Sequence, residues 1–446
     1  MNKCNPWRHA ALALALSTCL FPAAAPAAQG EQFFPVLVYR TGPYGPNGVP
    51  WANGYVDYLK MINARDGGIN GVKITFEECE TAYATDRGVE CYERLKGKGS
   101  TGATVVQPLS TGVTFALTEK APTDKIPLIT AGYGRSESQD GAVFKWNFPM
   151  LGTYWTGADI ILQDIIKREG GAAKLKGMKI ALVYHDSPYG KEPIALLEAR
   201  AKMHGYTLIK LPVTHPGVEQ KATWLQVRRD RPDYVLLWGW GVMNSTALKE
   251  AIATAYPLDH MYGVWWSGAE PDVKDVGMAA KGYHALAMQY GSGIGKVQSD
   301  ILKYVYDRNQ GTGPRDLVGQ VLYNRGLYSA MLGVEGVRRA QEQFGKKPMT
   351  GEQVRWGLEN ISFNETALKR LGVEGQLRPL RTTCEDHMGS SWARVQTWDG
   401  SRWVMAPTWY EADMQLIKPM VRDAAARYAK EHGFTPRDCA KEMSGS

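Results

Sequence analysis

The stretch INARDGGING at residues 62–71 says the most about how this chain folds. A segment with the apolar spacing of a helix, residues 51–62, runs into the double glycine, and residues 72–76 then have the pattern of a strand. Glycine permits the positive φ that ends a helix, and Asn70-Gly71 can reverse the chain. The stretch therefore predicts a helix that turns directly into a strand.

Strand and helix patterns alternate along the chain in two series. The first series places strands at residues 36–39, 72–76, 104–106 and 127–130, with helices at 51–62, 86–95 and 114–120. The second places strands at 179–184, 207–211, 234–238 and 261–265, with helices at 154–168, 191–204, 221–229 and 244–255. This alternation predicts parallel sheets. We expect an α/β fold with two similar, doubly wound, Rossmann-like lobes.

The last third of the sequence has a different pattern. Helices are expected at residues 297–308, 317–333 and 352–359, the last of them capped by Thr350. A β-ribbon follows at residues 392–397 and 402–405, and Asp399-Gly400 is a strong signal for its turn.

Residues 1–28 have the features of a cleaved signal peptide. Lys3 and Arg8 make a weakly basic start, residues 10–21 are apolar but too short to span a bilayer, and residues 25–27 fit a small-x-small cleavage site. Thr18 before Cys19 disfavours lipidation, because a lipoprotein box has Gly or Ala there. No later segment reaches about 18 uninterrupted apolar residues, so we expect a soluble chain exported to the periplasm.

Charge and motifs argue against several functional classes. The formal charge of +7 falls to +5 without Lys3 and Arg8, and the charges are dispersed, which does not suggest a nucleic-acid partner. Residues 97–102 match G-x-G-x-x-G, but they follow a helix and precede a strand, the reverse of a dinucleotide turn. Asp386-His387 is interpreted as ordinary turn polar groups. We expect no enzyme, no cofactor and no metal site.

Several patches, in order, resemble one family. They are Thr41-Gly42-Pro43, the strand at 126–131, the Asp-x-x-Tyr-Gly segment at 186–190, and Gly277 with residues 279–282. Together they resemble the periplasmic branched-chain amino acid-binding proteins, the type I solute receptors of ABC importers. The resemblance implies three crossings between the lobes, which form a hinge, near Met150, near 283–290 and just before Trp392.

With these crossings the chain divides into four parts. Lobe 1 is expected at residues 31–150 and 285–390, lobe 2 at 151–283 and 391–420, the signal peptide at 1–28, and a C-terminal extension at 421–446. The four cysteines that remain after signal removal favour disulfides in an oxidising compartment. Cys79 with Cys91 would close a short loop, as in the family, and Cys384 with Cys439 would tie the C-terminal extension to the body.

In open parallel sheets a ligand binds outside the carboxyl ends of the strands. Ser110 and Thr111 lie at such an edge, where hydroxyls and backbone N–H groups could bind a carboxylate; N-capping of the following helix needs the same residue types. In the family these loops do bind the ligand carboxylate, together with the positions of Ala131 and Tyr133. Aromatic residues at the other strand ends predict an aromatic-walled pocket, with core or rim packing as the alternative: Tyr189, Trp238, Trp240, Trp265 and Trp266.

Lys281 departs from the family pattern. The family has an acidic side chain there, which pairs with the α-ammonium of an amino acid, whereas a lysine would repel it. Either Lys281 points to solvent or the ligand lacks an ammonium, and we favour the second interpretation. The predicted ligand is therefore an uncharged or carboxylate-bearing, preferably aromatic, small molecule.

These observations predict a monomeric periplasmic substrate-binding protein that captures its ligand by hinge closure and delivers it to an inner-membrane ABC permease. Two alternatives stay open. One is a periplasmic sensor subunit that presents the same closed form to a membrane receptor, and the other is a true branched-chain amino acid binder.

Overall fold

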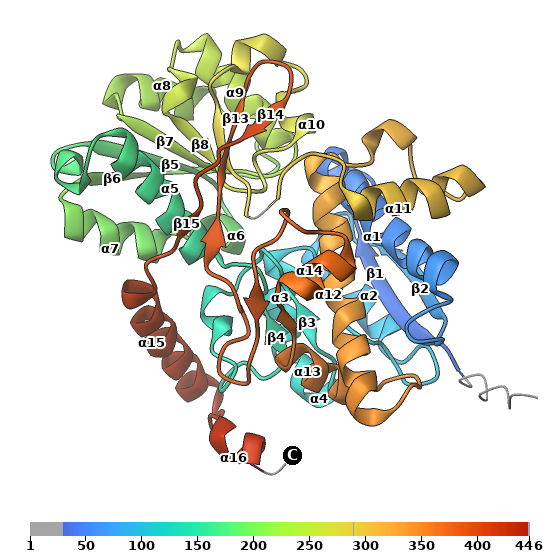
Figure 1. The fold of residues 1–446 in the computed structure, drawn as a ribbon. Helices are drawn as coiled ribbons and strands as arrows, with labels where there is room; N and C mark the ends of the chain where they lie inside the picture. Colours follow the sequence, from blue (N-terminus) through green and yellow to red (C-terminus); the bar gives the residue numbers. More distant parts are fainter. Residues whose placement is uncertain (1–29, 289, 445–446) are drawn as a thin grey trace, which may run out of the picture.

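The computed structural model describes residues 30–288 and 290–444, so the predicted signal peptide lies outside the described residues. Figure 1 shows an α/β molecule built around two groups of strands. We call the part around β1 (Gln32–Val38) lobe 1 and the part around β5 (Lys179–His185) lobe 2. The predicted α/β class is confirmed, and the exact bounds of the two lobes stay a prediction.

The strands of lobe 1 run parallel. β1 pairs with β2 (Ile74–Glu80), and β3 (Leu128–Ile129) pairs with β4 (Asn147–Phe148). The segment between these pairs joins them, because Thr104 N donates to Phe33 O at 3.0 Å and Val106 bridges to Leu128. The carboxyl ends of β1, β2 and β3 therefore share one edge.

The helices of lobe 1 come from two distant parts of the sequence. The first part supplies α1 (Gly45–Asp66), α2 (Thr85–Leu95), α3 (Thr111–Thr118) and α4 (Ala121–Asp124). The second supplies α11 (Lys296–Tyr304), α12 (Val321–Phe344), α13 (Gly351–Glu359) and α14 (Glu365–Leu371), with the short pair β10 (Ser362–Phe363) and β11 (Leu380–Arg381). α1 and α12 pack together along their length (Figure 1).

The predicted helix-to-strand turn at residues 62–71 is present. α1 ends at Asp66, and Gly67 follows with φ +71° and donates its N–H to Asn63 O. Gly68 has φ +105°, and a Cβ there would meet Val72 O at 2.1 Å. Only glycine fits that position, so the double glycine fixes the angle at which the chain enters β2.

Lobe 2 contains a seven-stranded sheet in the order β14-β13-β9-β8-β7-β5-β6. Its parallel part is β5 with β6 (Thr207–Val213), β7 (Tyr234–Trp238), β8 (Met261–Gly263) and β9 (His284–Leu286). Its antiparallel edge is β13 (Val395–Trp398) and β14 (Trp403–Met405), joined at the predicted Asp399-Gly400 turn. β9 thus extends this sheet slightly past the predicted lobe boundary at residue 283.

Helices cover both faces of this sheet. α5 (Tyr154–Arg168) and α7 (Ile194–His204) lie on one side, and α8 (Lys221–Asp230) and α9 (Val242–Ala253) lie on the other (Figure 1). Thr153 caps α5 through a reciprocal bond with Thr156, which explains its sharp start. The short helices α6 (Pro188–Lys191) and α10 (Glu270–Val273) follow β5 and β8.

The predicted ribbon at residues 392–397 needs one correction. Its first residues form a separate strand, β12 (Trp392–Ala393), which pairs with β15 (Tyr410–Glu411) rather than with β14. Arg394 interrupts the two strands because its N–H donates to Met288 O, and the N–H of Ala287 donates back to Arg394 O. Two of the predicted crossings therefore run side by side.

The C-terminal segment connects both lobes. α15 (Met414–His432) starts beside lobe 2, where Asp413 accepts from Arg200 and donates its N–H to Asp159 at 2.7 Å. The segment then ends on lobe 1 at α16 (Cys439–Ser444) (Figure 1). We call residues 413–439 the C-terminal strap.

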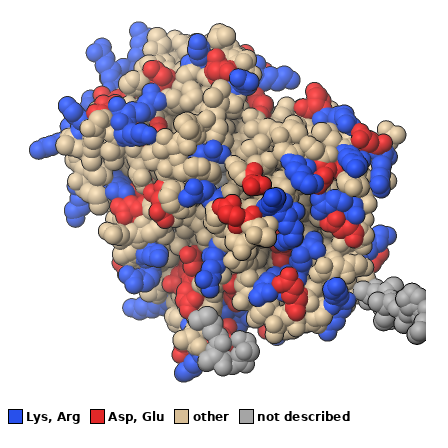
Figure 2. All heavy atoms as spheres, viewed as in Figure 1, with Lys and Arg blue, Asp and Glu red and all other residues tan. Residues whose placement is uncertain are grey.

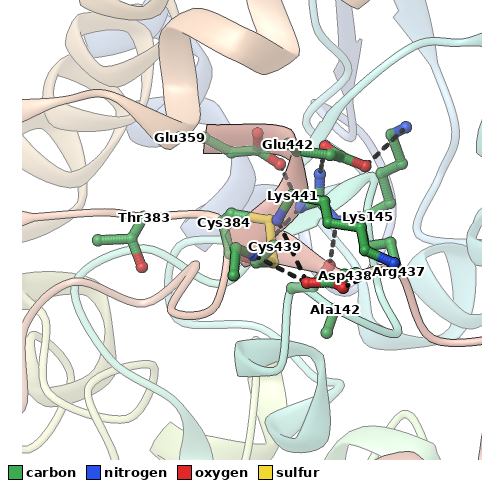
Figure 3. Close-up of a disulfide and its surroundings, with 12 residues drawn as sticks. Ala142, Lys145, Glu359, Thr383, Cys384, Arg437, Asp438, Cys439, Lys441 and Glu442 are labelled. Carbon is green, nitrogen blue, oxygen red and sulfur yellow. Dashed lines mark hydrogen bonds and ion pairs between the residues drawn. A yellow bond between two sulfur atoms is a disulfide. The ribbon is translucent and has the colours of Figure 1, made fainter. Parts of the chain in front are cut away.

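The strap is fastened to lobe 1 by a covalent bond and by charge. Figure 3 shows the Cys384–Cys439 disulfide beside the ion pair of Arg437 with Glu359. His387 is fully buried in the same cluster, and its Nδ1–H donates to Asn147 O, 2.7 Å away. Asp386 is a turn polar group as expected, because its Oδ1 accepts the N–H groups of Met388 and Gly389. His387 lies at the same bend but is buried against Arg437 of the strap. The predicted pair Cys79–Cys91 is also bonded, between β2 and α2.

Candidate functional site

Two small cavities lie at the carboxyl edges of the sheets, where the lobes meet. The tyrosine chamber has a volume of about 10 Å³ and takes its walls from both lobes. Its lining residues are Tyr39, Tyr83, Thr111, Tyr133, Tyr154, Tyr189, Trp240 and Trp266. The arginine chamber has a volume of about 20 Å³. Its lining residues are Ala131, Leu151, Trp266, Met288, Tyr290, Arg325, Tyr328, Ser329 and Leu377.

The tyrosine chamber is surrounded by buried polar atoms whose hydrogen bonds are not fully satisfied. The hydroxyls of Tyr39, Tyr133 and Tyr154 and Nε1 of Trp240 make no hydrogen bond of good geometry. Tyr39 interacts with Trp240, and Tyr154 interacts with Thr111, whereas the Tyr133 hydroxyl has no side-chain partner. Burial raises the pKa of each of these three tyrosines well above 10, so the hydroxyls stay protonated and can donate. Because a buried polar group without a partner is costly, the chamber is suited to a ligand with hydrogen-bonding atoms.

Two indoles of lobe 2 hold the loop that separates the chambers. Trp265 and Trp266 both donate their Nε1–H to Gly132 O, at 2.9 and 2.7 Å. The ring of Tyr133 stacks on Trp266 with centroids 4.9 Å apart. Trp266 lines both chambers, so the Tyr133–Trp266 stack is the wall between them.

Arg325, in α12, is the charged residue of the arginine chamber. It is 6% exposed, and its guanidinium lies 5.3 Å from the Trp266 ring. Nε and Nη2 have no hydrogen-bond partner. Burial lowers the pKa of Arg325 to about 9, and the nearby hydroxyls of Tyr133 and Tyr154 oppose that shift only in part.

Polar contacts join the lobes around the chambers. The Tyr44 hydroxyl of lobe 1 is hydrogen-bonded to His185 of lobe 2 at 2.8 Å, and Asn47 of lobe 1 donates to Asp272 of lobe 2 at 3.0 Å. Two further hydrogen bonds run from lobe 1 to lobe 2: Ser136 donates to Glu192 at 2.7 Å, and the N–H of Val321 donates to Glu270 at 3.1 Å. The two lobes therefore contact each other directly around the chambers.

Burial at this interface shifts several pKa values. It raises the pKa of Glu270 to about 7 and that of Asp272 to about 6, and it raises the pKa of Glu192 with the help of neighbouring Glu137. It lowers the pKa of His185 to about 4, and His215 adds to that shift. Burial therefore favours the neutral forms of all four groups.

The structure brings many of the candidate site residues together. Thr111, Tyr133, Tyr189, Trp240 and Trp266 line the tyrosine chamber, and Ala131 lines the arginine chamber. Tyr189 is held in place because its hydroxyl donates to Gly239 O at 2.8 Å.

The remaining candidates lie beside the chambers or away from them. Ser110 is the buried N-cap residue of α3, without a side-chain cap bond. Trp238 and Trp265 are fully buried and pack against Tyr154 rather than line a chamber. Lys281 is exposed and precedes β9, at the amino edge of the sheet, opposite the chambers. Of the two interpretations of Lys281, the structure supports the one in which it points to solvent.

Several chamber residues were not found from the sequence. Tyr39 and Tyr83 follow β1 and β2, so the strand-end rule could have found them, and Tyr154 opens α5. Arg325 gave only a weak signal, a single cation inside the otherwise apolar stretch of α12.

Two further features of the described residues concern membrane-spanning helices and groups of metal ligands. Among the described residues no helix is both long and apolar enough to cross a bilayer. Within residues 30–288 and 290–444 no three His, Cys, Asp or Glu side chains are grouped to hold a metal ion. Figure 2 shows acidic and basic side chains interspersed over the face viewed.

Comparison with known proteins gives a consistent result. A family profile described as periplasmic binding protein matches residues 31–402. No curated protein sequence matches the chain significantly.

Solved structures add detail. An ABC transporter permease from the Pseudomonas fluorescens group is 43% identical with a TM-score of 0.85, over 92% of this chain and 99% of that one. A branched-chain amino acid ABC transporter protein from Thermus thermophilus with bound valine is 20% identical, with a TM-score of 0.71 over 88% and 99% of the chains. A solute-binding protein from R. palustris in complex with benzoate is 16% identical, with a TM-score of 0.65 over 86% and 97%.

Proposed function

This chain belongs to the periplasmic binding protein family, and from that premise we propose that it is the substrate-binding component of an ABC importer. It captures one small solute between its lobes and presents the closed form to an inner-membrane permease. Export through a cleaved signal peptide at residues 1–28 and action as a monomer are part of the proposal.

One observation carries this proposal. The tyrosine chamber is enclosed by both lobes and is surrounded by buried donors that make no hydrogen bond of good geometry, from Tyr39, Tyr133, Tyr154 and Trp240. A ligand that pairs with these donors bonds to both lobes only when they are closed. Its binding free energy therefore shifts the population towards the closed form, which is how a ligand drives a hinge.

The composition of the chambers bears on the ligand. No residue lining either chamber is Asp or Glu, so an α-ammonium would find no counter-charge among the described residues that line the chambers. This disfavours leucine and valine for a different reason than Lys281, which is exposed. We propose an aromatic or carboxylate-bearing solute, and the solved relatives with benzoate and valine show that the fold accepts different chemistries.

Small-angle scattering combined with a thermal-shift screen tests the function. The screen should cover amino acids, aromatic acids, amides and alcohols. A compound that raises the melting temperature should also reduce the radius of gyration, or leave it unchanged if the free protein is already closed. The proposal fails if no small molecule binds, or if a bound compound is turned over.

A further inference from the structure

Arg325 is the exception among the buried arginines of the described chain. Arg200 donates from Nε to Asp159 at 2.7 Å, and Arg355 donates to Glu359 at 2.6 Å. Arg325 is as buried as these two, and no carboxylate is found among its electrostatic neighbours. An unpaired buried charge is strongly destabilising, so a structure that retains one calls for an explanation.

The two unpartnered atoms lie on one edge of the guanidinium. Nε–H and Nη2–H point in the same direction, and together they match the two oxygens of a carboxylate. This protein uses the same edge elsewhere. Arg40 holds Glu78 from Nε at 2.7 Å and from Nη2 at 2.9 Å, and Arg65 holds Asp66 in the same way at 2.8 and 2.9 Å.

Packing against Trp266 does not satisfy that edge. A cation–π contact uses the flat face of the guanidinium, whereas the N–H groups lie in its plane. Arg325 lines the arginine chamber, and the tyrosine chamber lies across the Tyr133–Trp266 wall. Tyr133 and Tyr154, whose free hydroxyls belong to the tyrosine chamber, are the electrostatic neighbours of Arg325.

We propose that Arg325 is the anion receptor of the binding site and that the transported solute is a carboxylate held by its Nε–Nη2 edge. This inference rests on the proposed function and names its substrate class. The carboxylate oxygens accept two N–H bonds from Arg325. The rest of the solute extends toward the hydroxyls of Tyr133 and Tyr154.

The chamber volumes set the size of the ligand. At about 20 and 10 Å³ the two chambers each have room for about one water molecule. Any acid must therefore enlarge the chamber. A short acid needs the smallest movement, whereas an aromatic acid requires the Tyr133–Trp266 stack to part. Comparing the affinities of acids of different length shows how far Tyr133 and Trp266 can move apart to admit a ligand.

Calorimetry with acids and their neutral amides tests the proposal. The probes are acetate, propionate and benzoate, each compared with acetamide, propionamide or benzamide, on the wild-type chain and on Arg325→Gln. We expect at least one acid to bind the wild type tenfold or more tightly than its amide. Arg325→Gln should reduce that preference to about one, and Arg325→Lys should restore part of it.

Two controls separate this role from a structural one. Arg339→Gln removes a positive charge from the same helix at an exposed position and should leave the acid preference unchanged. Thermal unfolding without ligand should show Arg325→Gln at least as stable as the wild type, because it removes an unpaired buried charge.

The outcomes distinguish the two proposals. If the amides bind equally well and close the lobes, the anion site is wrong and the receptor function stands. If Arg325→Gln keeps the acid preference, the site is also wrong. If none of the six probes binds, the carboxylate assignment falls, and the receptor function is then decided by the wider screen described above.

Discussion

The side-chain amide of Asn47, in the first helix of lobe 1, donates to Oδ1 of Asp272 in lobe 2 at 3.0 Å. Asn244 donates to the same oxygen at 2.9 Å, and Oδ2 of Asp272 accepts the N–H of Ala269 at 2.8 Å. Closing the lobes therefore places lobe 1 directly over a buried carboxyl group. Burial raises the pKa of Asp272, and the hydrogen bonds from Asn47 and Asn244 oppose that rise only in part, so protonation of Asp272 depends on its burial at this contact.

Closure should weaken as pH rises from 6.5 to 8. The raised pKa values of Glu270, about 7, and Asp272, about 6, mean that the closed form binds protons that an open form with ordinary carboxyls would not. Stability from a raised pKa is present at low pH and is lost as pH passes through that pKa. Glu270 and Asp272 together should lower the affinity for a bound probe about fivefold over this range, and the raised pKa of Glu192, about 8, should enlarge that fall, measured by calorimetry.

Below pH 6.5, His185 has the opposite effect on closure to the carboxyl groups. The lowered pKa of His185 means that an open form takes up a proton that the closed form does not, so His185 disfavours closure as pH falls from 6.5 towards 4. Glu270→Gln keeps an acceptor for the N–H of Val321. In this variant the affinity for the probe should fall less steeply as pH rises above 6.5. The exposed Asp275→Asn is the matched control, and an unchanged slope in Glu270→Gln would contradict the assignment.

Removal of the Tyr154 hydroxyl should have opposite effects on stability and binding. This hydroxyl is buried and, although it interacts with the Thr111 side chain, makes no hydrogen bond of good geometry. Tyr154→Phe should therefore make the free protein more stable, by up to about 1–3 kcal/mol, and should weaken ligand binding. Thermal unfolding and calorimetry measure the two effects. In Tyr206→Phe the lost hydroxyl donates to Leu197 O at 2.7 Å, so this control should lose about 0.5–1.5 kcal/mol instead. Loss of stability in Tyr154→Phe would argue against an unpartnered hydroxyl.

Loss of the Cys79–Cys91 bond should destabilise lobe 1 without abolishing binding. The bond joins residues separated by 12 positions, and closing a loop of this size contributes about 3 kcal/mol through the unfolded state. Denaturant unfolding of Cys79→Ser/Cys91→Ser should show that loss. Peptide mapping of exported protein that found both thiols free would refute the pairing.

The C-terminal strap should limit how far the lobes open. It is fixed to lobe 2 through Asp413 and Arg200 and to lobe 1 through the Cys384–Cys439 disulfide. In Cys384→Ser/Cys439→Ser the radius of gyration of the ligand-free protein should increase, while that of the bound form should not change. Small-angle scattering with and without ligand measures this, and the Cys79→Ser/Cys91→Ser variant is the control. Equal radii in both variants would show that the strap imposes no limit.

Much of the fold was predictable because local patterns determine it. The Gly67-Gly68 turn and the Thr350 cap each depend on neighbouring residues, and both are found as expected. The candidate site was predictable only where it follows strand ends, as at Thr111 and Tyr189. Arg325 lies in a helix far along the chain and reaches the site only through the packing of α12 on α1, which no local pattern encodes.

Lys281 is the opposite case: it was predicted to lie at the site, but the structure places it away from the chambers. The local similarity of residues 277–282 to a family segment was real as a pattern, but it did not determine which edge of the sheet the segment occupies. The structure places it before β9, at the edge away from the two chambers. A charge can be assigned to a site only when the direction of the adjacent strand is known.

The bonds from Trp265 and Trp266 to Gly132 O also give the protein an internal optical reporter. Both indole N–H groups cross from lobe 2 to one carbonyl of lobe 1. When the lobes separate, each indole must exchange that carbonyl for water, and its fluorescence emission moves to longer wavelength. The emission of these two tryptophans thus follows the state of the hinge in real time, without an attached dye.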